Sequence, residues 1–312
     1  MKTDRSRRKN FGDVSTVGTR AGSKAATPPV VLSFAASDPS GGAGMQADLA
    51  TFSALGCHGL SVLTALTAQD TRGVAEMRPI ESAWVEKQAR VVLDDIRVDA
   101  FKVGVLGSAE NVRAVARIVA AYPGVPVVVD PVLASGRGDP LADAPLADAL
   151  RSALFPLTFV ATPNLPEARR LAATGGEDEE TLPLDECARR FFSFGCAHVL
   201  LTGAHEDSPE VTNRLFDPTG ETRTFSCKRL PGSYHGSGCT LASALAAMLA
   251  RGLSVCDATA HALDFTYRAL ESAFRPGRGQ FIPRRIESGR DSAPRHVQSG
   301  FRLDSAEDPD TM

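Results

Sequence analysis

The sequence lacks several features that would place the protein in well-known classes. No run of apolar residues approaches the ~18 needed to span a membrane, so no membrane helix is expected. The six cysteines form no C-x-x-C pair, which argues against a structural zinc site. Neither sign of charge prevails, with 34 basic and 37 acidic residues, and such a mildly acidic chain is not expected to bind nucleic acid.

The two ends of the chain also lack apolar periodicity. Residues 1–27 hold seven Lys or Arg against two Asp and no apolar core, which excludes a signal peptide and predicts a disordered basic extension. An organellar transit peptide is the alternative. Residues 284–312 are predicted to form a second disordered tail. Without a signal peptide, the cysteines are expected to be reduced thiols in a cytoplasmic protein.

Residues 28–283 instead show a regular alternation of apolar runs and amphipathic stretches. This predicts one α/β domain in three layers, with a mostly parallel sheet covered by helices on both faces. The predicted strands are 30–36, 60–66, 101–106, 125–129, 158–161 and 198–202, with a hairpin over 214–216 and 222–226. The predicted helices are 45–55, 84–96, 112–121, 146–154, 166–173, 184–194, 239–251 and 256–274.

The clearest chemical motif is a glycine-rich stretch before the predicted helix at 239–251. Gly236, Ser237 and Gly238 allow successive backbone N–H groups to turn toward an anion, and the helix dipole adds to the attraction. Such a cradle could stabilise a phosphoryl group in transfer. Cys239 lies in the first helical turn, where the pKa of a thiol is lowered, so it could accept a hydroxyl proton. A flexible helix entry and a small buried cysteine are the alternatives.

Other polar stretches follow the predicted strands. The Asp38–Gly42 loop fits neither the Walker pattern nor the dinucleotide-binding pattern. Asp130 follows the valine strand, where a carboxylate can reach a metal or a nucleotide. Asn164 and Glu167 follow the next strand and could also cap a helix. The stretch with Thr202 and Gly203 lies at the end of the predicted strand 198–202. Because parallel strands end at one edge, these stretches are expected to meet in one crevice.

The roles of two charged residues, Asp48 and Lys102, remain open at this point. Asp48 falls in the first turn of a predicted helix, where a carboxylate is favoured by the dipole alone. Lys102 lies inside an apolar run, and a buried unpaired ammonium is costly. Lys102 therefore lies either at an exposed strand start or beside an anionic partner.

Taken together, several segments resemble one family. They are Asp38–Gly44, Phe52–Gly56, Thr64–Val74, Asp130–Val132, Thr162–Ala168 and His235–Thr240. The chain resembles, over roughly 29–283, the hydroxymethylpyrimidine/phosphomethylpyrimidine kinases of thiamine biosynthesis, which have a ribokinase-like fold. The resemblance implies ATP-dependent phosphorylation of 4-amino-5-hydroxymethyl-2-methylpyrimidine, then of its monophosphate, with Mg²⁺. Dimers are common in the family, so a homodimer is the assembly it suggests.

The resemblance also implies roles for individual residues. Asp48 and Gln69 would hydrogen-bond the pyrimidine, and Ala36 would lie beside it. Gly236, Ser237 and Gly238 would form the anion hole, with Cys239 where the wider superfamily places a catalytic Asp. The nucleotide would be bound by Asn164, Glu167, Thr202 and Gly203. Magnesium would be bound by Asp130 and Glu167.

The sequence departs from the family pattern at three places. Ala36 stands where a glycine is usual, and Thr202 stands where a lysine is usual. After Asp130–Val132 many relatives carry Lys-Ser-Gly, whereas this sequence has Ala-Ser-Gly followed by Arg137. The change at Thr202 makes the second phosphorylation the less secure of the two. A pyridoxal kinase is the nearest alternative function, because some share the glycine-cysteine ending. A non-catalytic binder of pyrimidine or nucleotide is the alternative from another class.

Overall fold

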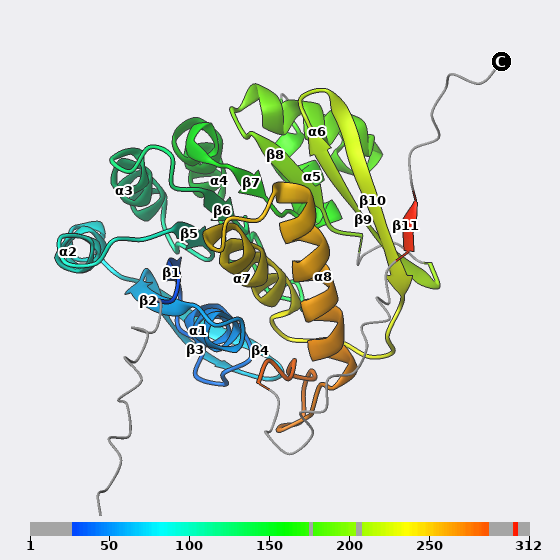
Figure 1. Cartoon of the computed structure of the whole chain (residues 1–312), viewed down its shortest axis with the longest axis horizontal. Coiled ribbons are helices and arrows are strands. Elements are labelled where there is room, and N and C mark those ends of the chain that lie inside the picture. Colours follow the sequence, from blue (N-terminus) through cyan, green and yellow to red (C-terminus); the bar gives the residue numbers. More distant parts are fainter. Residues whose placement is uncertain (1–26, 175–176, 204–207, 287–301, 305–312) are drawn as a thin grey trace, which may run out of the picture.

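The protein folds as a three-layer α/β/α structure (Figure 1). The structure is a computed structural model, and it describes residues 27–174, 177–203, 208–286 and 302–304. Its large sheet has the strand order β11-β10-β9-β8-β7-β6-β5-β1-β2. Parallel pairing joins β1 (Val30–Ala35), β2 (His58–Leu63), β5 (Ala100–Val103), β6 (Val127–Val129), β7 (Val160–Ala161) and β8 (His198–Leu201). The predicted fold class is confirmed.

Antiparallel strands extend one edge of this sheet. They are β9 (Glu210–Asp217), β10 (Gly220–Lys228) and β11 (Arg302–Asp304). The β9–β10 hairpin was predicted, and the turn between its strands contains Pro218 and Thr219. The β11 strand lies inside the tail that was predicted to be disordered, so that prediction is wrong for residues 302–304.

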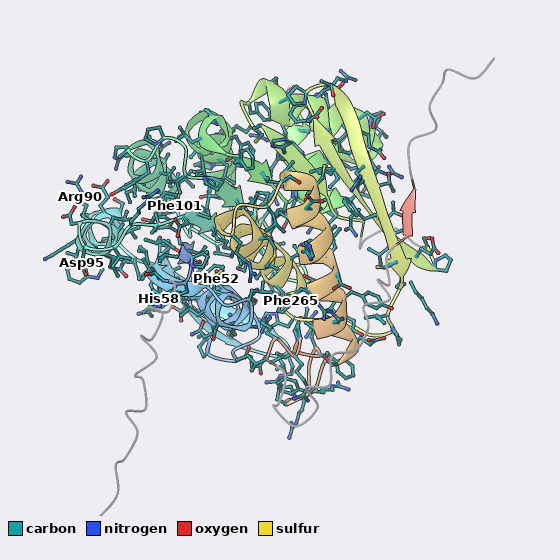
Figure 2. The ribbon with its side chains drawn as sticks, in the orientation of Figure 1. Phe52, His58, Arg90, Asp95, Phe101 and Phe265 are labelled. Atoms are coloured by element: carbon teal, nitrogen blue, oxygen red, sulfur yellow. The ribbon has the colours of Figure 1, made fainter. Side chains whose placement is uncertain are left out.

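Helices cover both faces of the sheet because each presents an apolar stripe to it. One face carries α1 (Gly44–Ala54), α7 (Ser237–Ala250) and α8 (Val255–Glu271) (Figure 1). The other carries α2 (Ser82–Leu93), α3 (Ala109–Ala120), α4 (Ala144–Ala149), α5 (Leu165–Ala172) and α6 (Leu184–Ser193). Side chains fill the two layers between them (Figure 2), with Phe52 of α1 in one and Phe101 of β5 in the other. No helix in the described ranges is long and apolar enough to cross a membrane.

Helix α7 is the central helix of its layer. Every residue from Thr240 to Leu249 is buried, because α1 and α8 pack on it while it lies on β5 and β6. A helix buried on all sides needs small or apolar residues all round, which the Ala-rich sequence supplies. The start of α7 is therefore held rigidly beside the carboxyl ends of the strands.

A second, two-stranded sheet stands apart from the large one. It is formed by β3 (Ala65–Asp70) and β4 (Gly73–Pro79). The predicted strand over 60–66 is therefore wrong beyond Leu63, where the chain leaves the sheet. Thr64 fixes this departure, since its hydroxyl donates to the Val105 carbonyl and its own carbonyl accepts from the Asn111 side chain. The apolar run gave no sign of the break.

The carboxyl-terminal boundary also differs from the prediction at 283. Arg285 is buried in the domain, with only 7% of it exposed, whereas its neighbours Arg284 and Ile286 are exposed. Sequence polarity suggested a tail, but buried polar contacts hold this arginine, and periodicity does not report such contacts. Of the predicted extension 1–27, all but Thr27 lies outside the described residues.

Candidate active site

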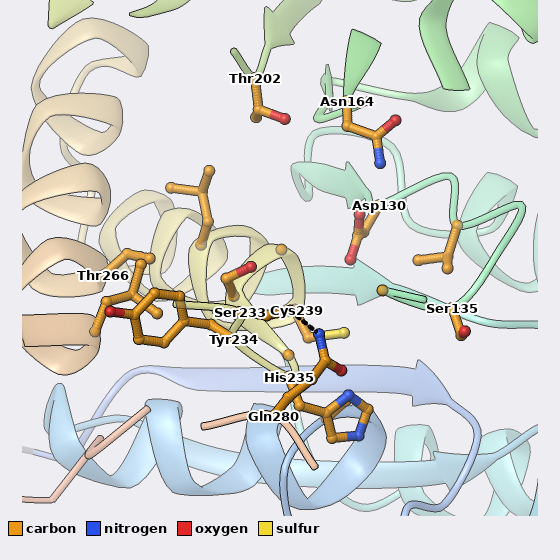
Figure 3. A pocket seen from close by; sticks show the side chains of 18 of the residues that line it. Asp130, Ser135, Asn164, Thr202, Ser233, Tyr234, His235, Cys239, Thr266 and Gln280 are labelled. Carbon is orange, nitrogen blue, oxygen red and sulfur yellow. Dashed lines mark hydrogen bonds between the residues drawn. The ribbon is translucent and has the colours of Figure 1, made fainter. Parts of the chain in front are cut away.

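The carboxyl ends of the parallel strands open into a cavity of about 440 Å³ (Figure 3). Loops after β1, β6, β7 and β8 line one part of it, and the start of α7 lines another. Thr67, Gln69, Val74 and Met77 of the β3–β4 hairpin cover a third side. The predicted meeting of the strand-end stretches in one crevice is thus confirmed, as expected for an open parallel sheet.

The glycine-rich stretch forms a backbone cradle at the start of α7. Gly236 has φ +80°, and a Cβ there would lie 2.0 Å from the Gly42 carbonyl oxygen, so only glycine fits. The helix begins at Ser237, and the N–H groups of Ser237, Gly238 and Cys239 precede the first intrahelical donor, Thr240. Three donors and the helix dipole thus face the cavity, an arrangement that suits an anion.

Cys239 lines the cavity beside this cradle, but its charge state differs from the prediction. Burial raises the pKa of its thiol to about 12; the Lys102 ammonium opposes this rise, and Asp130 and Asp48 add to it. The low pKa expected at a helix start is therefore wrong, because loss of solvent outweighs the dipole. The resting group is a thiol that hydrogen-bonds the Asp130 carboxylate.

Two carboxyl groups lie close together beside the cradle, after the ends of β6 and β7. Burial raises the pKa of Asp130 to about 6, opposed by Lys102. Burial and the Asp130 charge raise the pKa of Glu167 to about 8. Two buried carboxylates with raised pKa values are oxygen ligands that gain from a cation, so they fit Mg²⁺.

Glu167 also completes the helix cap that the sequence predicted. Its carboxylate accepts from the Asn164 N–H at 3.0 Å, and the Asn164 side chain accepts from the Glu167 N–H at 2.9 Å. This capping box fixes both side chains at the cavity edge. In Figure 3, Asp130, Asn164 and Thr202 lie at neighbouring strand ends. Gly203 lies behind them: a Cβ there would be 1.8 Å from the Thr212 carbonyl oxygen, and it does not line the cavity.

The predicted pyrimidine contacts divide into two groups. Gln69 and Ala36 line the cavity, the former on the inner face of β3. Asp48 does not line it: the residue is fully buried behind the cradle, and the expectation that it hydrogen-bonds the pyrimidine does not fit this placement. The sequence could not reveal this, because the partners of Asp48 come from distant segments.

Those partners also answer the question left open for Lys102. The Lys102 ammonium lies 2.9 and 3.0 Å from the two Asp48 oxygens, and both residues are fully buried. The hydroxyls of Ser33 and Ser243 donate to the same carboxylate at 2.6 and 2.7 Å. Although burial opposes it, the charges of Asp48 and Asp130 raise the pKa of Lys102, so the ammonium stays charged beneath the cradle.

Sequence reasoning missed a second pair that joins the first loop to the cradle. His235 Nε2 lies 2.9 Å from an Asp38 carboxylate oxygen. Burial would raise the pKa of Asp38, but hydrogen bonds from His235, Ser40 and the Ala43 N–H outweigh it and lower that pKa. Both residues lay in motifs that the sequence singled out, yet only their contact in the fold shows what they do.

Arg137 contacts the hairpin and does not line the cavity. Its guanidinium donates to the Arg72 carbonyl in the β3–β4 turn. Gly279 N–H and Gln280 N–H donate to Thr71 in the same turn, at 3.0 and 2.8 Å. The hairpin is thus tied down over the cavity from two directions.

A cavity with a backbone anion cradle, paired carboxylates and an ordered hairpin cover defines a phosphotransferase site in a ribokinase-like fold. The sequence model of the family described as phosphomethylpyrimidine kinase matches residues 38–283, and the chain belongs to that family.

Individual relatives agree with this membership. The hydroxymethylpyrimidine/phosphomethylpyrimidine kinase of Escherichia coli is 41% identical over 78% of this chain and 91% of its own. The thiamine biosynthesis bifunctional protein of Geobacter sulfurreducens is 43% identical over 80% of this chain, which spans only 50% of that longer relative. The structure of the pyridoxal kinase from Staphylococcus aureus in complex with AMP-PCP and pyridoxal matches with a TM-score of 0.73 at 30% identity, over 83% of this chain and 94% of that one.

Proposed function

We propose that the protein is a hydroxymethylpyrimidine/phosphomethylpyrimidine kinase of thiamine biosynthesis. It phosphorylates the hydroxymethyl group of 4-amino-5-hydroxymethyl-2-methylpyrimidine with ATP and then phosphorylates the monophosphate. The observation that carries this proposal is that the backbone cradle, Cys239 and Gln69 line one cavity in a member of this family. Relatives that cover almost the whole domain carry the same activity in their names.

ATP would lie along the strand ends with its γ-phosphate at the start of α7. The N–H groups of residues 237–239 would receive the phosphate oxygens, and Asn164 and Thr202 would lie beside the nucleotide. A cradle of fixed donors is effective in phosphoryl transfer because it needs no reorganisation as charge spreads over the oxygens.

The pyrimidine would lie beneath the hairpin, beside Ala36 and Gln69. An amide offers both a donor and an acceptor, as the amino-substituted ring requires. Val74, Met77 and Val105 line the same cavity and supply apolar surface for the ring and its methyl group. The ring would then direct its hydroxymethyl group toward the cradle.

Cys239 and Asp130 would carry the proton of the attacking hydroxyl. The hydroxyl would donate to the Cys239 sulfur while the thiol donates to the Asp130 carboxylate. As the oxygen attacks phosphorus, its proton passes to sulfur and the thiol proton passes to Asp130. The high pKa of the thiol suits a relay of this kind better than a free thiolate.

Mg²⁺ would be held by Glu167, and by Asp130 through water, together with phosphate oxygens, which leaves Asp130 free to accept the proton from Cys239. Magnesium binds through one or two carboxylates in such sites and keeps several waters. Bound there, it would neutralise charge on the transferred phosphate. Before phosphoryl transfer the two carboxyl groups would then be ionised as a pair, which their raised pKa values oppose without a cation.

Pyridoxal phosphorylation is the second candidate function. It is favoured by the structural match to a pyridoxal kinase bound to pyridoxal. Gln69 distinguishes the two, since its amide pairs with the amino group that pyridoxal lacks. The test is to determine kcat/KM of the full chain for both substrates, with ADP formation as the readout. The proposal requires the pyrimidine to be preferred; a preference for pyridoxal would replace it with the second candidate, and release from neither would leave a binder.

Location and assembly complete the proposal. All six cysteines are free thiols, in keeping with a reducing compartment such as the cytoplasm. A homodimer remains the expected assembly on family grounds. Sedimentation of the full chain measures it directly.

A further inference from the structure

Arg285 connects two loops that lie on either side of the reaction centre. Its Nε donates to the Thr240 hydroxyl at 3.0 Å, in the first turn of α7. Its two terminal nitrogens donate to the carbonyls of Gly41 and Gly42 in the loop after β1, and one also reaches the Gly236 carbonyl at 3.4 Å. One side chain thus joins the loop before α1 to the cradle before α7.

All of these acceptors are neutral oxygens. Among the described residues no carboxylate lies within ion-pair distance of Arg285, although only 7% of the residue is exposed. A buried guanidinium is costly unless its donors are satisfied, and only a planar group with five donors can reach both loops at once. The site thus matches the hydrogen-bonding geometry of arginine in particular.

The carbonyls that Arg285 binds belong to peptides whose N–H groups point the opposite way. In a trans peptide the C=O and N–H are antiparallel, so fixing the Gly236 carbonyl aims the Ser237 N–H of the cradle toward the cavity. Fixing the Gly42 carbonyl likewise aims the Ala43 N–H at Asp38, which it reaches at 2.6 Å. Arg285 therefore orients donors on both sides without contacting a ligand itself.

These two loops carry the two reactants. Ala43 and Gly44 line the cavity from the substrate side, and Ser237 and Gly238 line it at the phosphate side. The His235–Asp38 contact is a second tie between the same loops. The distance from the acceptor hydroxyl to the phosphorus therefore depends on how firmly the loops are joined, and a misplacement of about 1 Å can lower a rate by ~10²-fold.

We propose that Arg285 is a positioning residue that sets the cradle against the substrate loop. This inference rests on the proposed kinase function. It predicts that losing the guanidinium lowers kcat more than it weakens binding of ATP, because the loops are still present but no longer aligned.

The test compares Arg285→Met and Arg285→Lys with Arg284→Met in the full chain. Arg284 is the matched control, being an exposed neighbour whose guanidinium lies over the Phe274 ring at 5.1 Å. We expect kcat for the pyrimidine to fall ~10-fold or more in Arg285→Met, with KM for ATP within ~3-fold of wild type. Arg285→Lys should fall between, since lysine keeps the charge but not the fork, and Arg284→Met should match wild type.

Hydrogen exchange supplies a readout that turnover alone does not. In Arg285→Met, the hydrogen-bonded amides of 41–44 and of Thr240 should exchange faster together, while those of β5 stay protected. If kcat per folded molecule is unchanged in both Arg285 variants while only melting temperature falls, the positioning role is overturned. Should Arg285→Met fail to fold, the kcat and exchange of Arg285→Lys decide the question.

The outcome also separates this inference from the proposed function. Failure of the wild-type chain to phosphorylate the pyrimidine would overturn the function, and the exchange comparison would still test the tie. A chain ending at 283 should behave like Arg285→Met, whereas one ending at 290 keeps Arg285 and should turn over normally. Equal activity of the two truncated chains would contradict the inference.

Discussion

At the scale of single residues, the chemistry of the site depends on which side chains the fold buries together. The sequence correctly placed the cradle and Cys239, because glycines before a helix are a local signal. It gave the wrong charge state for the thiol, because the buried surroundings of Cys239 come from β5, β6 and α1. Desolvation and neighbouring charges decide a pKa, and neither can be read from adjacent residues.

Cys239 provides the first residue-scale prediction. Replacing it with alanine removes the group that passes the hydroxyl proton, so kcat should fall ~10²-fold or more, with little change in KM for ATP. Cys239→Ser retains a group that donates and accepts, and should lie between. Cys256→Ala on α8, which lines no part of the cavity, is the control. A Cys239→Ala enzyme with most of its turnover would exclude the relay.

Gln69 provides the second residue-scale prediction. Gln69→Ala should weaken the pyrimidine by about 1–3 kcal/mol while leaving ATP unchanged, because the ring loses its polar partner. Glu76→Ala, on the exposed face of the same hairpin, is the matched control. Steady-state kinetics with each substrate varied in turn measures both effects. Equal losses for ATP and pyrimidine would instead show that Gln69 orders the hairpin.

At the scale of elements, the most informative contact is the buried pair that joins helix to strand. Lys102 of β5, Asp48 of α1 and Ser243 of α7 meet in one network, although they lie 54 and 195 residues apart. The elements themselves were predictable from local periodicity, as the close match of α1 and α7 shows; the β9–β10 hairpin was also predicted, but with strands shorter than those observed. Contacts of this range, and the departure of β3 from the sheet, were not.

That network makes a stability prediction. Lys102→Met leaves the Asp48 carboxylate buried without a counter-charge, which should lower the free energy of unfolding by about 3–5 kcal/mol. The double variant Lys102→Met with Asp48→Leu should recover a large part of the loss, because no charge remains buried. Urea denaturation measures four chains: the wild type, Lys102→Met, Asp48→Leu and the double variant. Additive losses in the double variant would show that the two residues act independently.

At the scale of the whole molecule, stability should depend on pH through the paired carboxyls. The pKa of Glu167 is raised from 4.5 to about 8 and that of Asp130 from 3.8 to about 6. Between those values the folded state binds more protons than the unfolded state. The contribution of these two groups to stability is therefore fully present below their unfolded pKa values and is lost as pH rises toward 8, by on the order of a few kcal/mol.

The matched variant for this prediction is Glu167→Gln, which can still cap α5 but does not titrate. Between pH 5.5 and pH 8.5, its free energy of unfolding should fall less than that of the wild type. Both are measured by urea denaturation without metal or nucleotide. Equal pH slopes in the two chains would contradict the raised pKa of Glu167.

The central claim is that this chain transfers the γ-phosphate of ATP to the pyrimidine alcohol. Product analysis is the direct test: the full chain is incubated with ATP, Mg²⁺ and 4-amino-5-hydroxymethyl-2-methylpyrimidine, and the pyrimidine is followed by phosphorus NMR and mass spectrometry. We predict a monophosphate first and a diphosphate later, with one ADP for each phosphate transferred. Release of ADP without a phosphorylated pyrimidine, or an unchanged pyrimidine after many enzyme equivalents of ATP, would contradict the claim.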